Sequence, residues 1–224
     1  MHSNRYIIFF TIIMCVIISF ILSTVSISLK SKQEINKQID KNKNILIAAG
    51  ISIDNEDIQD IYEKRVNLIM INKTGDILEN IDSINDKSHL PLYEINDSND
   101  SNKINAYVYP IVGKGLWSTL YGYLAVNSNG TEIIGLTFYK HGETPGLGAE
   151  IEKLSFRNNF IGKKLYKENK FIGITIAKGK ARDHANYSFE SDHIVDGISG
   201  ATITAKGVEK MMKKEPLKYH KFFK

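Results

Sequence analysis

Two glycine-rich segments in the second half of the chain carry the side chains best suited to chemistry. The first, residues 141–150, reads His-Gly-Glu-Thr-Pro-Gly-Leu-Gly-Ala-Glu and directly follows an apolar, strand-like run. Glycine and proline together make a rigid loop whose backbone can come close to a flat ligand. Within this loop Glu143 offers an acceptor, Thr144 a hydroxyl and Leu147 an apolar contact. A ligand clamp and a simple structural turn explain the segment equally well.

This loop does not match the dinucleotide-binding fingerprint, although Gly146 and Gly148 share part of its spacing. The fingerprint requires a third glycine where this chain has Ile151, and it opens a helix between parallel strands. No alternation of strands and helices surrounds the loop in the sequence. The pattern therefore gives no support for a Rossmann-type site.

The second segment, residues 196–202, reads Asp-Gly-Ile-Ser-Gly-Ala-Thr and leads into an amphipathic run. Small residues before a hydroxyl at a helix start leave backbone N–H groups exposed, and the helix dipole favours an anion such as phosphate there. The alternative is that Ser199 or Thr202 simply caps the helix. The residues alone leave both interpretations open.

Other polar and aromatic residues are weaker candidates. Trp117, the only tryptophan, is suited to stacking on a ring or to a core or subunit contact. Lys206 follows Thr202 by about one helical turn, where it can balance phosphate charge or simply face water. The acids and histidines at 183–184 and 192–193 lack metal-ligand spacing, so we predict no metal site.

The N-terminal part of the chain predicts a membrane anchor. Residues 6–29 are uncharged and strongly apolar, and about 20 such residues in a helix span a bilayer. A cleaved signal peptide is the alternative, but the apolar cores of signals are shorter, about 7–15 residues. We expect a tail at 1–5, a retained transmembrane helix at 6–29 and a polar membrane-proximal helix or linker at 30–50. Basic residues on both sides of the span leave its orientation undecided.

Composition limits the classes of function. The 224 residues are 42% hydrophobic and 24% charged, which excludes a wholly disordered chain. A net charge of +4 is too small to indicate nucleic-acid binding by itself. The single cysteine, Cys15, excludes an intrachain disulfide framework.

Residues 51–224 are expected to form one α+β domain, with a mixed, largely antiparallel sheet and packed helices. An Asn-Gly pair at 129–130 predicts a hairpin, and residues 80–101, rich in Asn, Asp and Ser, predict a surface loop without a calcium-binding pattern. The predicted strands are 66–71, 106–112, 121–126, 131–139 and 171–177. The predicted helices are 54–66, with Asp54 as N-cap, 154–164, and one beginning near Thr202.

Residues 196–202 resemble the flavinylation motif of FMN-binding domains, Asp-x-x-Ser/Thr-Gly-Ala-Thr. In that family a flavin transferase joins FMN through its phosphate to the last threonine, which is Thr202 here. The resemblance implies that Asp196 assists the metal-dependent transfer. It also implies cofactor contacts at Ser199, Gly200 and Ala201.

Within that family, residues 115–117, 141–148 and 199–202 together are similar to the C subunits of the Na⁺-translocating NADH:quinone reductases. The likeness spans the anchor and nearly all of the soluble domain. The cofactor-binding residues that it implies in the loop are Glu143, Thr144, Gly146, Leu147 and Gly148. Further flavin contacts are implied at Trp117, His141 and Lys206.

The resemblance implies a single-pass flavoprotein that carries covalent FMN on an extracytoplasmic domain at the bacterial inner membrane. It would relay electrons in a complex that passes them from NADH to quinone and exports Na⁺. Its partners would be the other subunits, a flavin transferase during maturation and membrane lipid, with no nucleic acid. Two alternatives are the G subunit of a ferredoxin:NAD⁺ reductase complex and a membrane-tethered, non-redox binding domain.

Overall fold

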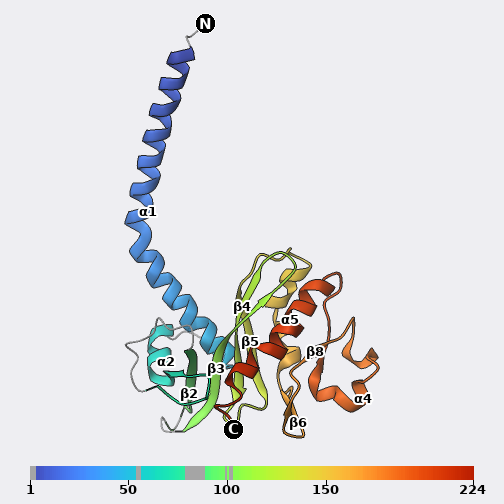
Figure 1. Cartoon of the computed structure of the whole chain (residues 1–224). Coiled ribbons are helices and arrows are strands. Elements are labelled where there is room, and N and C mark those ends of the chain that lie inside the picture. Colours follow the sequence, from blue (N-terminus) through green and yellow to red (C-terminus); the bar gives the residue numbers. More distant parts are fainter. Residues whose placement is uncertain (1–3, 54–56, 79–88, 99, 101–102) are drawn as a thin grey trace. The chain divides into compact units, whose positions relative to one another are not determined.

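The computed structural model describes residues 4–53, 57–78, 89–98, 100 and 103–224. The chain forms two compact units, one ending at Lys41 and the other comprising Asn42–Lys224. The first consists of most of the long helix α1 (Asn4–Ala48), whose last turns belong to the second unit. The second holds the sheet and the remaining helices (Figure 1).

The expected N-terminal helix is confirmed as α1, which is long and apolar enough to cross a membrane. Its side chains from Asn4 to Asp40 are exposed, as expected for a segment that lipid or solvent surrounds. The predicted membrane span and membrane-proximal helix form one uninterrupted element, because neither glycine nor proline occurs before Gly50. Gly50, at φ +74°, adopts the left-handed conformation typical of a helix C-terminus.

A five-stranded antiparallel sheet forms the centre of the second unit, which confirms the predicted α+β class with a largely antiparallel sheet. Its strands lie side by side in chain order: β1 (Val66–Ile71), β2 (Leu90–Asn96), β3 (Ile104–Lys114), β4 (Thr119–Asn127) and β5 (Ile133–Lys140). The Asn-Gly pair forms the predicted β4–β5 hairpin, in which Gly130 has a φ of +68°.

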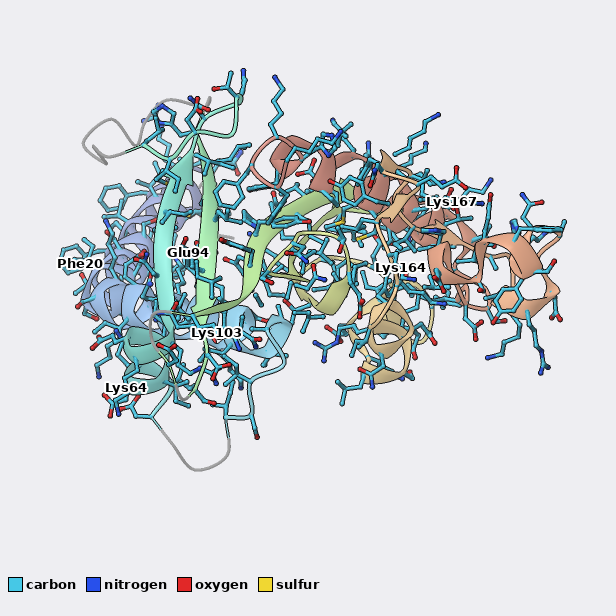
Figure 2. All side chains as sticks on the ribbon, turned by 90° about the horizontal axis from the view of Figure 1, so that it is seen from below. Phe20, Lys64, Glu94, Lys103, Lys164 and Lys167 are labelled. Atoms are coloured by element: carbon cyan, nitrogen blue, oxygen red, sulfur yellow. The ribbon has the colours of Figure 1, made fainter. Side chains whose placement is uncertain are left out.

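Strand β2 shows that the predicted surface loop at 80–101 is wrong over its second half. The strand pairs with both β1 and β3, and it buries Leu92, Tyr93 and Ile95. Its partly buried Glu94, which Figure 2 labels, accepts a hydrogen bond from Asn67 Nδ2 on β1 at 2.8 Å. The polar residues on either side conceal this short apolar run in the sequence. Positions 80–88, 99 and 101 of that predicted loop lie outside the described residues.

Helix α2 (Ile58–Arg65) is shorter than the predicted helix at 54–66. Its N-cap is Asp57, whose Oδ1 accepts the N–H of Gln59 at 2.9 Å. Asp54, the predicted cap, lies outside the described residues.

Glycine also interrupts two predicted elements in the C-terminal half. The helix expected at 154–164 consists of α3 (Leu154–Arg157) and a 3₁₀ turn (Asn158–Phe160), and Gly162 follows at φ +78°. The strand expected at 171–177 is divided by Gly173, at φ +70°, into two short strands. These short strands and their partners are β6 (Tyr166–Lys167) with β7 (Lys170–Phe171), and β8 (Thr175–Ile176) with β9 (Ile194–Val195). A further short helix is α4 (Tyr187–Glu190).

Different elements cover the two faces of the sheet. Alternate residues of a strand point to opposite faces, so Val108 of β3 joins one cluster and Tyr109 the other. The Val108 cluster includes Ile45 and Ala48 from the end of α1. The Tyr109 cluster includes the apolar face of α5 (Thr202–Lys214), the predicted last helix, which packs on β3 (Figure 1). This packing holds the first turn of α5 beside the turn between β3 and β4.

Candidate functional site

Three loops that are distant in the sequence meet at the first turn of α5. They are the β3–β4 turn at 115–118, the loop at 141–148 after β5 and the turn at 199–201 before α5. Together they form a pocket of about 400 Å³. The residues that line it are Leu116, Trp117, Glu143, Thr144, Leu147, Gly148, Gly200, Ala201, Thr202, Ile203 and Thr204. Most of the predicted site residues are therefore neighbours in the fold.

Glu143 connects its own loop to the β3–β4 turn and to the first turn of α5 through its carboxylate. Oε1 accepts the backbone N–H groups of Trp117 at 3.0 Å and Ser118 at 3.1 Å. Oε2 accepts the N–H of Leu116 at 3.1 Å and the hydroxyl of Thr204 at 2.5 Å. Only 5% of Glu143 is exposed. The pocket wall is therefore built around a buried, fully bonded carboxylate.

These bonds keep Glu143 ionised. Burial alone raises the pKa of a carboxyl group, because it removes water from the charged form. The hydrogen bonds from Thr204 and from the N–H groups of the β3–β4 turn outweigh burial, so the pKa of Glu143 lies below its ordinary value. The pocket thus has a negative charge at neutral pH, which the oriented N–H dipoles of the β3–β4 turn and the Thr204 hydroxyl stabilise.

His141 lies beside the pocket and does not line it. Its Nε2 lies 3.2 Å from Glu152 Oε2, and its Nδ1 accepts the backbone N–H of Glu143 at 3.2 Å. Only 10% of its side chain is exposed. Within the described part of the chain, these contacts make His141 a support for the backbone of Glu143.

The start of α5 presents Thr202 to solvent. Thr202 is the first helical residue and is exposed, and the preceding Ala201 occupies the N-cap position without a side-chain oxygen. No described side chain caps this helix, so the cap by Ser199 or Thr202 that the sequence allowed is not formed. The first N–H groups of a helix have no partner within the helix. This 13-residue helix therefore begins with donors and a hydroxyl that an anion can use.

A second groove, of about 690 Å³, lies on the other side of Thr202. Three lysines, Lys178, Lys180 and Lys206, line it together with Ser199 and Gly200. Ser199 also lines a third hollow that includes Gly146. Thr202 thus lines both hollows: the pocket that contains Trp117 and Leu147, and the lysine-lined groove, which we call the basic groove.

Asp196 organises one wall of the basic groove. Its Oδ1 accepts the N–H of Ala181 at 2.7 Å, and its Oδ2 pairs with Lys180 Nζ at 2.8 Å. Burial raises the pKa of this carboxyl, but the bonds to Ala181 and Lys180 outweigh burial and lower it. The acid of the motif is therefore ionised and bound to the chain's own residues in this structure.

Sequence reasoning missed Thr204, Ser118 and Lys180. Thr204 and Ser118 bond to Glu143, and the Ser118 hydroxyl also accepts the N–H of Gly142 at 2.6 Å. Thr204 lies on the buried face of α5. A hydroxyl within the apolar face of a predicted helix could therefore have indicated a buried hydrogen bond at this position. Nothing in the local sequence around Ser118 or Lys180 indicates their partners.

The described residues suit a flat, phosphate-bearing ligand such as FMN. The pocket side offers exposed apolar surface on Leu116, Trp117, Leu147 and Ile203. The opposite side offers lysines and the uncapped start of α5. Gly200, at φ +73°, brings the backbone so close to Leu147 that an added Cβ would lie 2.8 Å from its Cδ2.

An apolar anchor helix followed by a sheet domain with this site defines the chain as a membrane-anchored protein with an FMN-binding domain. Residues 115–214 match the family model described as FMN-binding domain. The chain is 34% identical to the C subunit of the Na⁺-translocating NADH-quinone reductase of Haemophilus ducreyi, over 90% of this chain and 85% of that protein. The C subunit of the Yersinia pestis reductase is 33% identical, over 88% and 83%.

Solved structures agree. The crystal structure of the C subunit of the Parabacteroides distasonis reductase has a TM-score of 0.74 at 32% identity, over 87% of this chain and 96% of that one. The structure of NqrC from Shewanella oneidensis gives 0.69 at 27% identity, over 84% and 96%. The chain belongs to the family of C subunits of the Na⁺-translocating NADH-quinone reductases.

Proposed function

We propose that this chain carries one FMN in phosphoester linkage to Thr202 and relays electrons as the C subunit of a Na⁺-translocating NADH:quinone reductase. The observation that best supports this proposal is the position of Thr202. It is an exposed threonine at the uncapped start of α5, and it lines both the pocket and the lysine-lined groove. The family of the chain supports the same function. When bound, FMN supplies one- and two-electron transfer.

The pocket and the groove beside Thr202 would bind different parts of FMN, the flavin ring and the phosphate respectively. On the pocket side, Trp117 and Leu147 offer apolar contact to a ring, and Thr144 and Gly148 complete the lining. On the other side, the N–H groups of the first turn of α5 would hold the phosphate, with Ser199, Gly200 and Lys206 around it. His141 and Asp196 would act indirectly, because each accepts a hydrogen bond from a backbone N–H group that borders the site.

The attachment site also indicates how the protein would mature and assemble. A flavin transferase would make the phosphoester, and the exposure of Thr202 leaves the hydroxyl open to such an enzyme. The domain would lie on the extracytoplasmic side of the inner membrane, where no cytoplasmic FMN pool can replace a lost cofactor. A covalent bond removes that loss. The NADH and quinone sites would belong to other subunits.

The test is the intact mass of the full chain after co-expression with a flavin transferase. We expect a gain of one FMN less one water, and we expect Thr202→Ala to abolish it because alanine has no oxygen to esterify. Thr131→Ala, which changes an exposed threonine in the β4–β5 hairpin, is the matched control and should retain the adduct. An adduct on Thr202→Ala would disprove the attachment site, and a colourless, unmodified wild type would favour a non-redox binding domain.

A further inference from the structure

The carboxylate of Glu143 is engaged on all sides by donors of the protein itself. A carboxylate accepts about four hydrogen bonds, two at each oxygen. Oε1 receives two backbone N–H groups, and Oε2 receives one N–H and the hydroxyl of Thr204. Glu143 therefore has no acceptor position left for a cofactor, and its influence on the site passes through the groups that it holds.

Among those four donors, Thr204 belongs to α5 and the other three belong to the β3–β4 turn. Thr204 is 1% exposed, whereas Thr202, two residues earlier, is exposed. Two residues along a helix are about 200° apart around its axis, so the two hydroxyls face opposite ways. The inward hydroxyl fixes the helix start while the outward one stays free.

We propose that Thr204 is a positioning residue for flavin attachment. Its hydrogen bond to Glu143 ties the first turn of α5 to the loop at 141–148 and the β3–β4 turn, and so sets the direction of the Thr202 hydroxyl. This inference rests on the proposed attachment at Thr202. We call the Thr204–Glu143 pair, with the N–H groups of residues 116–118, the clasp.

Two glycines show how closely the backbone surrounds the clasp. A Cβ added at Gly115 would lie 2.5 Å from Glu143 Oε1. A Cβ added at Gly148 would lie 2.8 Å from Glu143 Oε2 and 2.7 Å from Thr204 Oγ1. Any larger residue at either position would displace the carboxylate or the hydroxyl. Both glycines are therefore needed to leave room for the clasp.

The rate of flavin attachment depends on the direction in which the Thr202 hydroxyl points. The reaction forms a bond between the Thr202 oxygen and the flavin phosphorus and breaks the phosphoanhydride bond of an activated flavin donor. The other phosphate-bearing part of the donor leaves with the bonding electron pair, and the hydroxyl proton passes to water. A nucleophile misplaced by about 1 Å can lose about 100-fold in rate. A helix start that is free to shift against the pocket would therefore slow the transfer without removing the nucleophile.

A pair of substitutions separates positioning from simple packing. Thr204→Val keeps the volume but removes the donor, which leaves a buried carboxylate oxygen short of a partner. Thr204→Ser keeps the donor but removes a buried methyl group. If Thr204 only fills space, Thr204→Ser should impair FMN incorporation more than Thr204→Val does. If Thr204 positions Thr202, Thr204→Val should impair it more.

The experiment measures the initial rate of FMN incorporation into the full chain with the flavin transferase, by intact mass, together with the fluorescence anisotropy of the attached flavin. We expect Thr204→Val to slow incorporation about tenfold or more and to lower the anisotropy, with Thr204→Ser near wild type. Thr137→Val is the matched control: Thr137 is 1% exposed, lies on β5 and bonds the carbonyl of Asn44. It should leave both readouts unchanged.

Wild-type rate and anisotropy in Thr204→Val, or a larger loss in Thr204→Ser, would overturn the proposal. Should the valine variant not fold, Glu143→Gln decides, because it replaces one acceptor oxygen with an NH₂ group that faces donors; incorporation must then fall in Glu143→Gln and not in Thr204→Ser. Failure of the proposed function looks different: the wild type itself would take up no FMN, or Thr202→Ala would take it up.

Discussion

At the residue scale, the site depends on a carboxylate whose partners are spread along the chain. Glu143 and Thr204 are 61 positions apart, so no local pattern connects them. The sequence marks Glu143 as a candidate because it lies in a glycine-rich loop, and the structure gives the reason for one of these glycines, Gly148, where a Cβ would meet Glu143 and Thr204. A residue predicted to face a ligand thus serves as the internal support of the pocket wall.

This arrangement predicts a pH dependence of stability. The pKa of Glu143 is lower in the folded chain than in the unfolded one, so ionised Glu143 stabilises the fold above its unfolded pKa of about 4.3. That contribution is lost as the pH falls through the lower, folded pKa. We expect Glu143→Gln to lower the Tm at pH 7 and the difference from wild type to shrink below about pH 4.3. Thermal unfolding by circular dichroism across this range is the measurement.

Glu168→Gln is the control for this pH series, since Glu168 is exposed in the turn between β6 and β7. It should follow the wild-type curve at every pH. A gap between wild type and Glu143→Gln that stays constant from pH 7 to pH 3 would show that ionised Glu143 gives no net stabilisation.

At the element scale, regular periodicity made some elements predictable and others not. The anchor, the β4–β5 hairpin and α5 each carry a signal that lies within a few residues, and each is confirmed. Strand β2 is central in the sheet but short, and its neighbours are polar, so composition pointed to a loop. The amphipathic pattern after Thr202 located the start of α5, whereas the partners of Glu143 and Asp196 depend on packing between elements.

The contact between α5 and β3 yields a prediction at this scale. Gly207 lies where a Cβ would overlap the carbonyl oxygen of Lys114. Alanine favours a helix over glycine by about 1 kcal/mol, but overpacking costs about 1–3 kcal/mol or more. A Cβ that overlaps a backbone oxygen puts the cost at the upper end of that range, so after subtraction of the helix gain we expect Gly207→Ala to destabilise the fold by about 2 kcal/mol, measured by denaturant unfolding in detergent. Lys210→Ala, on the exposed face of the same helix, should stay within about 0.5 kcal/mol of wild type. Equal or higher stability of Gly207→Ala would mean that α5 has room to move away from β3.

At the scale of the whole molecule, the chain divides within helix α1. The compact second unit begins at Asn42, whereas the sequence placed the start of the domain at residue 51. The periodicity of a long helix gives no sign of where lipid or solvent is replaced by protein contacts. The burial of Ile45, Leu46 and Ala48, each 0% exposed, marks that point in the structure. The last turns of the anchor helix are therefore part of the core of the flavin-bearing unit.

Two truncated chains test this division. A chain of residues 42–224 keeps the buried end of α1, so we expect a soluble protein that unfolds cooperatively and accepts FMN at Thr202. A chain of residues 51–224 loses the buried residues Ile45, Leu46 and Ala48, of which Ile45 and Ala48 belong to the Val108 cluster. Losing one large buried aliphatic side chain costs about 2–5 kcal/mol, and whole domains have only about 5–15 kcal/mol of stability. We therefore expect the shorter chain to be largely insoluble or to melt at a much lower temperature, as measured by soluble yield and thermal unfolding. Equal Tm values for the two chains would mean that the sheet domain is complete without α1.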